Sequence, residues 1–425
     1  MNTTQSVSEK SAISGVIKRD VENTINPRQK SQQHYIQREE TTYLRVTLSF
    51  FTVGLATFAL LYFIQPILPI LSKEFNISPA NSSLALSLTT GVLSLGLLIT
   101  GPLSDALGRK NVMVISLVAA AIFTLLSAVV SSWHGILFIR ALVGLSVSGV
   151  AAIAMTYLSE EIHPSYVALS IGLYISGNSI GGMSGRLITG VITDHHSWRF
   201  AVILLGAFAL ISSIAFWKLL PESKHFKSSP VKLKTLLINL KIHFRDQGLP
   251  LLFAEAFLIM GGFITMFNYI GYRLSEAPYN LSQTTIGLLS IVYLTGTYSA
   301  TKAGALTSKH GRGKVLLMAI STMLVGCVIT LFSPLWVVIL GVMILTTGFF
   351  AAHAVASGWI GQRTKRAKAQ ASSLYLFFYY SGSSIAGTLG GVFWSHFSWN
   401  GVAAFISLLT IVALYLGFKL NKLSK

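Results

Sequence analysis

Long runs of apolar residues, separated by short polar stretches, dominate this chain of 425 residues. About twelve runs are long enough to cross a bilayer, because each approaches or exceeds the roughly 20 residues that a helix needs to span the hydrocarbon core. They lie at about 46–71, 80–103, 111–131, 134–158, 166–190, 198–220, 249–272, 282–304, 314–333, 335–358, 369–392 and 398–419. The pattern predicts an all-α membrane protein with twelve transmembrane helices.

Charged residues make up only 11% of the chain, against about a quarter in a typical soluble protein. The net charge is nevertheless +18, and 27 of the 32 Lys and Arg residues fall on one side of the membrane if the N-terminus is cytoplasmic. This positive-inside bias places both termini in the cytoplasm. We therefore interpret the excess charge as an orientation signal and a contact for membrane lipid, and not as a nucleic-acid surface.

Internal repeats divide the chain into two related parts. Gly101-Pro-Leu-Ser-Asp105-Ala-Leu-Gly108-Arg109-Lys110 recurs in weaker form as residues 304–312, and residues 176–180 recur as 381–385. Such internal similarity is typical of transporters built from parallel halves. We expect six-helix halves at 46–220 and 249–420, a cytoplasmic linker at 221–248 and a polar, disordered tail at 1–45. Residues 231–241 fit either a helix lying on the inner membrane surface or a plain connector.

Several motifs resemble the major facilitator superfamily. The turn at 101–110 is similar to the signature loop of that family, and Arg140 with Gly144 resembles its second motif in proton-coupled antiporters. Gly177, Gly181, Gly182 and Gly185 are similar to the glycine-rich fifth-span pattern of its efflux branches, although Gly182 replaces a Pro and Arg186 replaces the final Gly.

The opening Tyr62-x-x-Gln65-Pro66-x-x-Pro69, together with residues 181–186, most resembles a bacterial inner-membrane subgroup of drug or sugar efflux carriers. The resemblance covers about 45–420. It implies a monomeric carrier that alternates access to a central cavity by rocking its two halves.

The repeated turn is the candidate gate. Gly101-Pro102 permits a sharp exit from the second span, and Asp105 is able to accept from backbone donors and to pair with a cation. The resemblance implies that this loop latches the cytoplasmic side in the outward-facing state. The alternative is a turn that only connects two helices. The candidate gating residues are Gly101, Asp105, Gly108, Arg109, Lys110, Gly304, Gly311 and Arg312.

Ionisable residues inside the predicted spans are costly and need a partner or a wet cavity. Glu255 is the candidate proton carrier, with a cytoplasmic ion pair as the alternative, and His353 is either a titrating group or a packing residue. Arg140 is a candidate for proton coupling and for cargo binding, or else a structural Arg bonded to carbonyl groups. Arg186 suits an anionic or polar cargo, unless it snorkels to the interface.

Polar and aromatic residues of the first, fifth, seventh and eleventh spans are candidates for lining a cavity that binds amphipathic cargo. The alternative for each is ordinary packing. They are Tyr62, Gln65, Asn178, Asn268, Tyr269, Tyr375, Tyr379 and Tyr380.

No phosphate-binding loop, catalytic triad or metal-ligand spacing is present in the sequence, and its one cysteine, Cys327, lies in an apolar run. We expect no enzyme activity, no catalytic residue, no cofactor and no metal. The prediction is a proton-coupled exporter of a drug, sugar or organic acid. A nutrient importer, or a transporter-like sensor without flux, are the alternatives.

Overall fold

The computed structural model describes residues 35–226 and 233–423, and those residues are almost entirely helical. The first half contains six long helices and the short helix α3 (Leu68–Glu74). The long helices are α2 (Thr41–Tyr62), α4 (Pro79–Leu107), α5 (Arg109–Ser127), α6 (Trp133–Glu161), α7 (Pro164–His195) and α8 (Trp198–Leu219).

The second half follows α9 (Leu233–Arg245). It contains α10 (Leu249–Ser275), α11 (Gln283–Leu288), the 3-10 turn η2 (Leu289–Val292), α12 (Tyr293–His310), α13 (Arg312–Ile329), α14 (Leu335–Arg363) and α15 (Lys368–Leu423). Ser398 has non-helical backbone angles (φ 50°, ψ −143°), so α15 is two helices joined across a kink. If α11, η2 and α12 are counted as one crossing and α15 as two, each half has six crossings.

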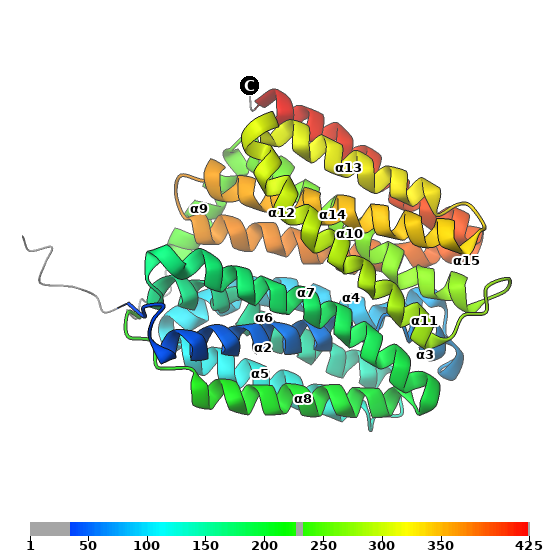
Figure 1. The fold of residues 1–425 in the computed structure, drawn as a ribbon, viewed down its shortest axis with the longest axis horizontal. Coiled ribbons are helices and arrows are strands. Elements are labelled where there is room, and N and C mark those ends of the chain that lie inside the picture. Colours follow the sequence, from blue (N-terminus) through cyan, green and yellow to red (C-terminus); the bar gives the residue numbers. More distant parts are fainter. Residues whose placement is uncertain (1–34, 227–232, 424–425) are drawn as a thin grey trace, which may run out of the picture.

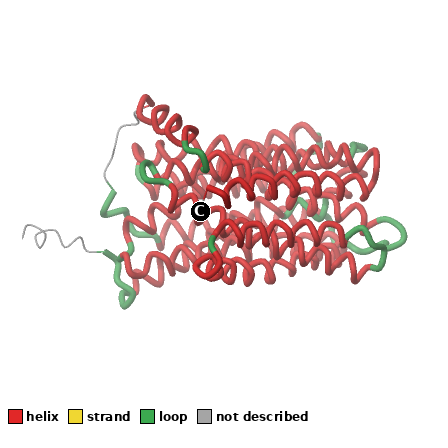
Figure 2. Tube along the Cα trace, turned by 90° about the horizontal axis from the view of Figure 1, so that it is seen from above, coloured by secondary structure: helices red, strands yellow, loops and turns green. Residues whose placement is uncertain are grey.

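Nine helices of the described residues are long and apolar enough to span a membrane, including the double helix α15. The other two crossings, α7 and α11–α12, are rich in Gly, Ser and Thr, which lowers their mean hydropathy. The helices run roughly parallel, with the loops at the two ends of the bundle (Figure 2). Large apolar side chains such as Val129, Phe138 and Ile211 are more than half exposed on the outer surface, as lipid contact requires.

The sequence repeat is visible in the fold. Gly108 ends α4 and Gly311 ends α12, and both have positive φ (93° and 80°). Because L-residues with a side chain rarely adopt that region, these glycines make the turn possible. Close helix contacts also recur, since Gly177 lies against the backbone of Phe51 and Gly382 against that of Phe257.

Two expectations need correction. Gly101 and Pro102 do not end the second span, because α4 continues to Leu107 and the turn occurs at Gly108. Residues 35–45, expected within a disordered tail, pack on the bundle: α2 begins at Thr41, and Ile36 forms a β-bridge with Ile162. The remainder of that tail, 1–34, lies outside the described residues.

The bundle has two ends, which we name by their contents. The linker side holds Gly108, Gly311, α9 and the end of α15, and the far side holds α3 and the loop between α10 and α11 (Figure 1). The expected linker helix is present as α9, and its Phe244 packs on Phe253 of α10 and Phe378 of α15. Cys327 is fully buried in α13, where its thiol faces the Ala403 carbonyl at 3.5 Å.

Candidate functional site

The two halves are joined by hydrogen bonds toward the far side, most of them between neutral groups. Gln65 Nε2 donates to Asn268 Oδ1 at 2.8 Å, and Tyr272 Oη donates to the Leu68 carbonyl at 3.0 Å. Asp194 at the end of α7 accepts from the backbone N–H groups of Gln283 and Thr284 at the start of α11. These contacts connect α3, α7 and the turn between α2 and α3 in the first half to α10 and α11 in the second.

Small residues form a second area of contact between the halves. Along α4 and α15, Gly391 lies against Ala80, and Gly91 lies against Ser384. Weak hydroxyl contacts continue the same seam toward the middle of the bundle, from Ser383 to Thr90 and from Ser381 to Ser94. A seam of small residues lets the helices approach closely.

Arg186 sits at the centre of the meeting surface and is only 3% exposed. Its Nε donates to Gln65 Oε1 at 2.7 Å and its Nη1 donates to the Gly182 carbonyl at 2.5 Å. Its Nη2 has no hydrogen-bond partner among the described residues. Because Arg186 lies in the interior, it does not snorkel to the interface.

Aromatic rings enclose the Arg186 guanidinium. Its Cζ lies 4.6 Å from the ring centre of Tyr62, 4.8 Å from that of Tyr293 and 5.5 Å from that of Phe267. The Tyr293 hydroxyl is buried and lacks a partner in the described part of the chain. Each ring face attracts a cation, but none carries the negative charge that would neutralise it.

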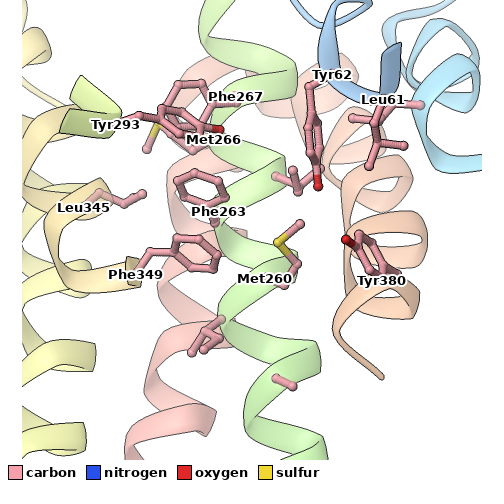
Figure 3. Close-up of a cluster of buried hydrophobic side chains, with 14 of the residues drawn as sticks. Leu61, Tyr62, Met260, Phe263, Met266, Phe267, Tyr293, Leu345, Phe349 and Tyr380 are labelled. Carbon is pink, nitrogen blue, oxygen red and sulfur yellow. The ribbon is translucent and has the colours of Figure 1, made fainter. Parts of the chain in front are cut away.

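The aromatic surface continues from this cage toward the linker side. Phe267 contacts Phe263, Phe263 stacks on Phe349 with ring centres 3.8 Å apart, and Phe349 stacks on His353. Figure 3 shows Phe263 and Phe349 on one side of this region and the hydroxyl groups of Tyr62 and Tyr380 pointing toward the space beside Met260 on the other. The result is a buried aromatic surface that faces two tyrosine hydroxyl groups.

Arg140 has different surroundings. Its guanidinium donates to the carbonyl groups of Ala85, Leu60 and Leu61 at 2.9 to 3.0 Å and lies over the Phe63 ring. These contacts tie α6 to α2 and α4 inside the first half. They favour the structural alternative over a cargo or proton role for Arg140.

Glu255 is fully buried in α10, and neither carboxylate oxygen has a hydrogen-bond partner within the described residues. One oxygen lies against Gly417 of α15. The alternative of an ion pair with a linker or loop Lys is therefore absent from the described residues. Tyr375 lies close enough to Glu255 for electrostatic interaction, and its hydroxyl is 3.0 Å from His353 Nδ1. Three titratable groups from α10, α15 and α14 are thus neighbours.

On the linker side, Arg109 is the centre of a charged cluster. It forms ion pairs with Asp105 and, through Nε and Nη2 at 3.1 and 2.9 Å, with Glu160. Lys110 pairs with Glu222 at 3.0 Å. All of these groups belong to the first half or to the start of the linker. Gly304 and Arg312, the counterparts in the second half, are exposed or partly exposed.

The predicted cavity residues do not all meet. Tyr62, Gln65, Arg186 and Asn268 come together, and Tyr375, Tyr379 and His353 form a second group. Tyr269 instead lies beside the seam between α4 and α15, where its hydroxyl donates to the Gly387 carbonyl at 2.7 Å. Asn178 lies beside Gly54 and Tyr174, away from Arg186.

A small cavity borders Arg186, with room for water more than for a drug-sized molecule. It is lined by Gln65, Pro66, Arg186, Phe267, Ile270, Ile286, Leu289 and Ser290. The sequence interpretation missed Tyr293, Phe263, Phe267 and Phe349, because aromatic residues in an apolar run carry no signal of what they face. No cluster of three metal-ligating side chains occurs in the parts that the structure describes.

The chain is similar to known transporters along most of its length. Residues 47–278 and 274–423 each match the model of the Major Facilitator Superfamily. The Escherichia coli (strain K12) inner membrane transport protein YnfM is 62% identical over 91% of this chain and 93% of its own length. The uncharacterized MFS-type transporter YybF of Bacillus subtilis (strain 168) is 42% identical over 90% and 95% of the two chains.

Among solved structures, a bacterial homologue of the human lysosomal transporter Spinster, in an inward-facing and unoccupied conformation, matches with a TM-score of 0.75. It covers 91% of this chain and 98% of its own, at 15% identity, so this likeness shows the fold alone. The sequence repeats, the two six-helix halves and the family match agree. The chain belongs to the Major Facilitator Superfamily.

Proposed function

We propose that this protein exports a small molecule across the bacterial inner membrane by alternating access, driven by the proton gradient. The inner-membrane assignment is supported by the name of its relative YnfM. The distribution of Lys and Arg supports a cytoplasmic linker side and a periplasmic far side. The resemblance of the fifth span to the efflux branches of the superfamily supports export as the direction of transport.

The observation that carries alternating access is the chemistry of the contact between the halves. Neutral hydrogen bonds such as Gln65 to Asn268 each contribute roughly 1 kcal/mol, and the two bonds to the Asp194 carboxylate are exposed to solvent. The seam between α4 and α15 is built from small residues such as Gly, Ala, Ser and Thr. A contact of this kind opens at low cost. The halves are therefore able to separate on the far side and to meet on the linker side.

The cluster at Asp105, Arg109 and Glu160 is the proposed cytoplasmic gate. In this conformation its ion pairs stay within the first half. When the linker side closes, the same charged groups would meet the ends of the second-half helices, whose C-terminal and N-terminal backbone groups attract opposite charges. The gate would then exchange internal pairs for pairs between the halves.

Glu255 is the proposed proton carrier. Its apolar surroundings disfavour a bare charge, and its neighbour Tyr375 is hydrogen bonded to His353, which stacks on Phe349. A proton held at Glu255 would reach the middle of the protein through those two side chains. Cargo binding and protonation would then be coupled through one connected group of residues.

The test is proton movement in energised inside-out vesicles, followed with a pH-sensitive dye as cationic dyes, antibiotics, pentoses and organic acids are added. We expect a compound-dependent collapse of the gradient in the wild type and none in Glu255→Gln. Glu276→Gln, which alters an exposed carboxylate in the far-side loop, is the matched control and should behave as wild type.

Labelled-cargo flux in vesicles of both orientations separates the alternatives. Accumulation in right-side-out vesicles with an imposed proton gradient would replace the exporter with an importer. Binding of a compound with no flux in either orientation would make the protein a sensor.

A further inference from the structure

The buried charge of Arg186 lacks a counterion. No Asp or Glu within the described ranges forms an ion pair with it. A guanidinium removed from water without a negative partner costs several kcal/mol. Arg140 is equally buried but has three carbonyl acceptors. Arg186 has only one carbonyl and one side-chain amide, so its electrostatic deficit is the larger of the two.

The groups without partners at this position are both donors. Arg186 Nη2 and the Tyr293 hydroxyl are buried, have no acceptor among the described residues, and belong to side chains whose Cζ and ring centre are 4.8 Å apart. Two donors on neighbouring side chains, beside an uncompensated positive charge, match an acceptor that carries negative charge. A neutral sugar would satisfy the donors but would leave the charge in place.

The aromatic side chains around Arg186 indicate the chemistry of the rest of the ligand. Tyr62 and Phe267 enclose the guanidinium, and the aromatic surface extends from Phe267 through Phe263 to Phe349. An apolar or aromatic body would pack along this surface, as rings do when they are offset or edge-to-face. These rings are buried in the present conformation, so the apolar body would reach them only when the halves separate.

We propose that Arg186 and Tyr293 bind the carboxylate of an organic anion whose apolar, preferably aromatic, body lies along Phe267, Phe263 and Phe349. This inference rests on the proposed transport function and names its cargo class. Because Arg186 also holds Gln65, and Gln65 holds Asn268, a carboxylate that recruits the guanidinium acts directly on the bond between the halves. Binding of cargo and release of the far-side contact are then one event.

The test is ligand-induced thermal stabilisation of the purified full-length protein in detergent. The probes are benzoate, hippurate and 4-phenylbutyrate, each compared with its own primary amide. A ligand that binds only the folded state raises the melting temperature, and we expect a rise of about 2 °C or more with the carboxylates and none with the amides. The rise should be lost in Arg186→Gln and partly restored in Arg186→Lys.

Two further variants protect the test from a folding artefact. Tyr293→Phe removes only a hydroxyl and should weaken carboxylate affinity roughly fivefold, the loss of one hydrogen bond. Arg199→Gln removes a partly exposed Arg paired with Glu74 and should keep the wild-type response. Equal stabilisation by acid and amide, an unchanged response in Arg186→Gln, or no response of the wild type to any carboxylate would overturn the proposal.

The vesicle assay distinguishes this proposal from the proposed function. Proton movement with neutral or cationic compounds but not with carboxylates would refute the anion site and leave the transport function standing. Carboxylate binding through Arg186 with no flux of any compound would refute the transport function and leave the site standing.

Discussion

Gln65 and Asn268 join the two halves through a hydrogen bond of 2.8 Å between their side-chain amides. Arg186 donates to the carbonyl oxygen of the same Gln65 amide at 2.7 Å. The buried guanidinium and this contact between the halves therefore share one side chain.

Asn268→Ala should shift the protein toward a conformation that is open on the far side. The substitution removes one neutral hydrogen bond between the halves, worth roughly 1 kcal/mol or about fivefold in a conformational equilibrium. Hydrogen–deuterium exchange of residues 283–288 should rise accordingly. Asn81→Ala, an exposed Asn on the same side, should leave exchange unchanged, and equal exchange in both variants would exclude this role.

Gly108→Ala and Gly311→Ala should each destabilise the protein by about 1–3 kcal/mol, the cost of placing a side chain at a strained positive φ. Gly101→Ala and Gly304→Ala should be neutral or slightly stabilising, because both positions are helical. A Cβ at any of the four sites would meet no atom within 4 Å. The pairs therefore differ only in backbone conformation. Thermal unfolding in detergent measures the difference, and similar melting temperatures for all four would contradict the explanation.

Asp105→Asn should insert normally and reduce flux several-fold. The substitution removes the charge that pairs with Arg109 and leaves Glu160 as its only carboxylate partner in the described residues. Initial rates of flux, normalised to protein in the membrane, test this. Glu222→Gln removes an exposed carboxylate from the adjacent Lys110 pair and should have little effect. Wild-type rates in Asp105→Asn would refute the gate.

Asp246 should make stability depend on pH below about 4. Burial favours its neutral form, but hydrogen bonds from Arg363 and from the N–H groups of Leu249 and Gly248 outweigh burial and hold the pKa of Asp246 below its usual value. Since the unfolded pKa is about 3.9, this stabilisation is complete above that value and is lost as pH falls through the folded pKa.

Asp246→Asn should therefore lower the melting temperature at pH 7, and the gap to wild type should close as pH falls below 4. The double variant Asp246→Asn with Arg363→Gln should have a melting temperature only slightly below that of the less stable single variant, since both substitutions remove the same interaction. A gap that stays constant with pH would show that the charge of Asp246 is irrelevant.

The architecture was predictable from sequence because apolar length and charge placement act on whole segments. The number of crossings and the two related halves follow from the lengths of the apolar runs and from the internal repeats. These patterns hold even where the end of a single helix is predicted wrongly. The predicted end of the second span at Gly101-Pro102 was wrong for a local reason. Pro102 is accommodated inside α4, and the helix ends at Gly108, which has a positive φ. The identity of the helix breaker depends on backbone angles that composition does not specify.

The site was only partly predictable. Intramembrane charge identified Arg186 and Glu255, because such residues are costly wherever they lie. The surroundings that separate Arg186 from Arg140 could not be read from sequence, since three carbonyl groups from α2 and α4 converge on Arg140 only after folding. Tyr293 was missed for the same reason: its importance comes from the residue it faces.

The burial of Cys327 has a practical consequence. It is the single cysteine of the chain and is inaccessible between α13 and α15. A maleimide or nitroxide label applied to the folded protein would react with an introduced surface cysteine and leave this thiol untouched. Pairs of labels on the two halves would then report inter-half distances in the otherwise native chain, without prior removal of its own cysteine.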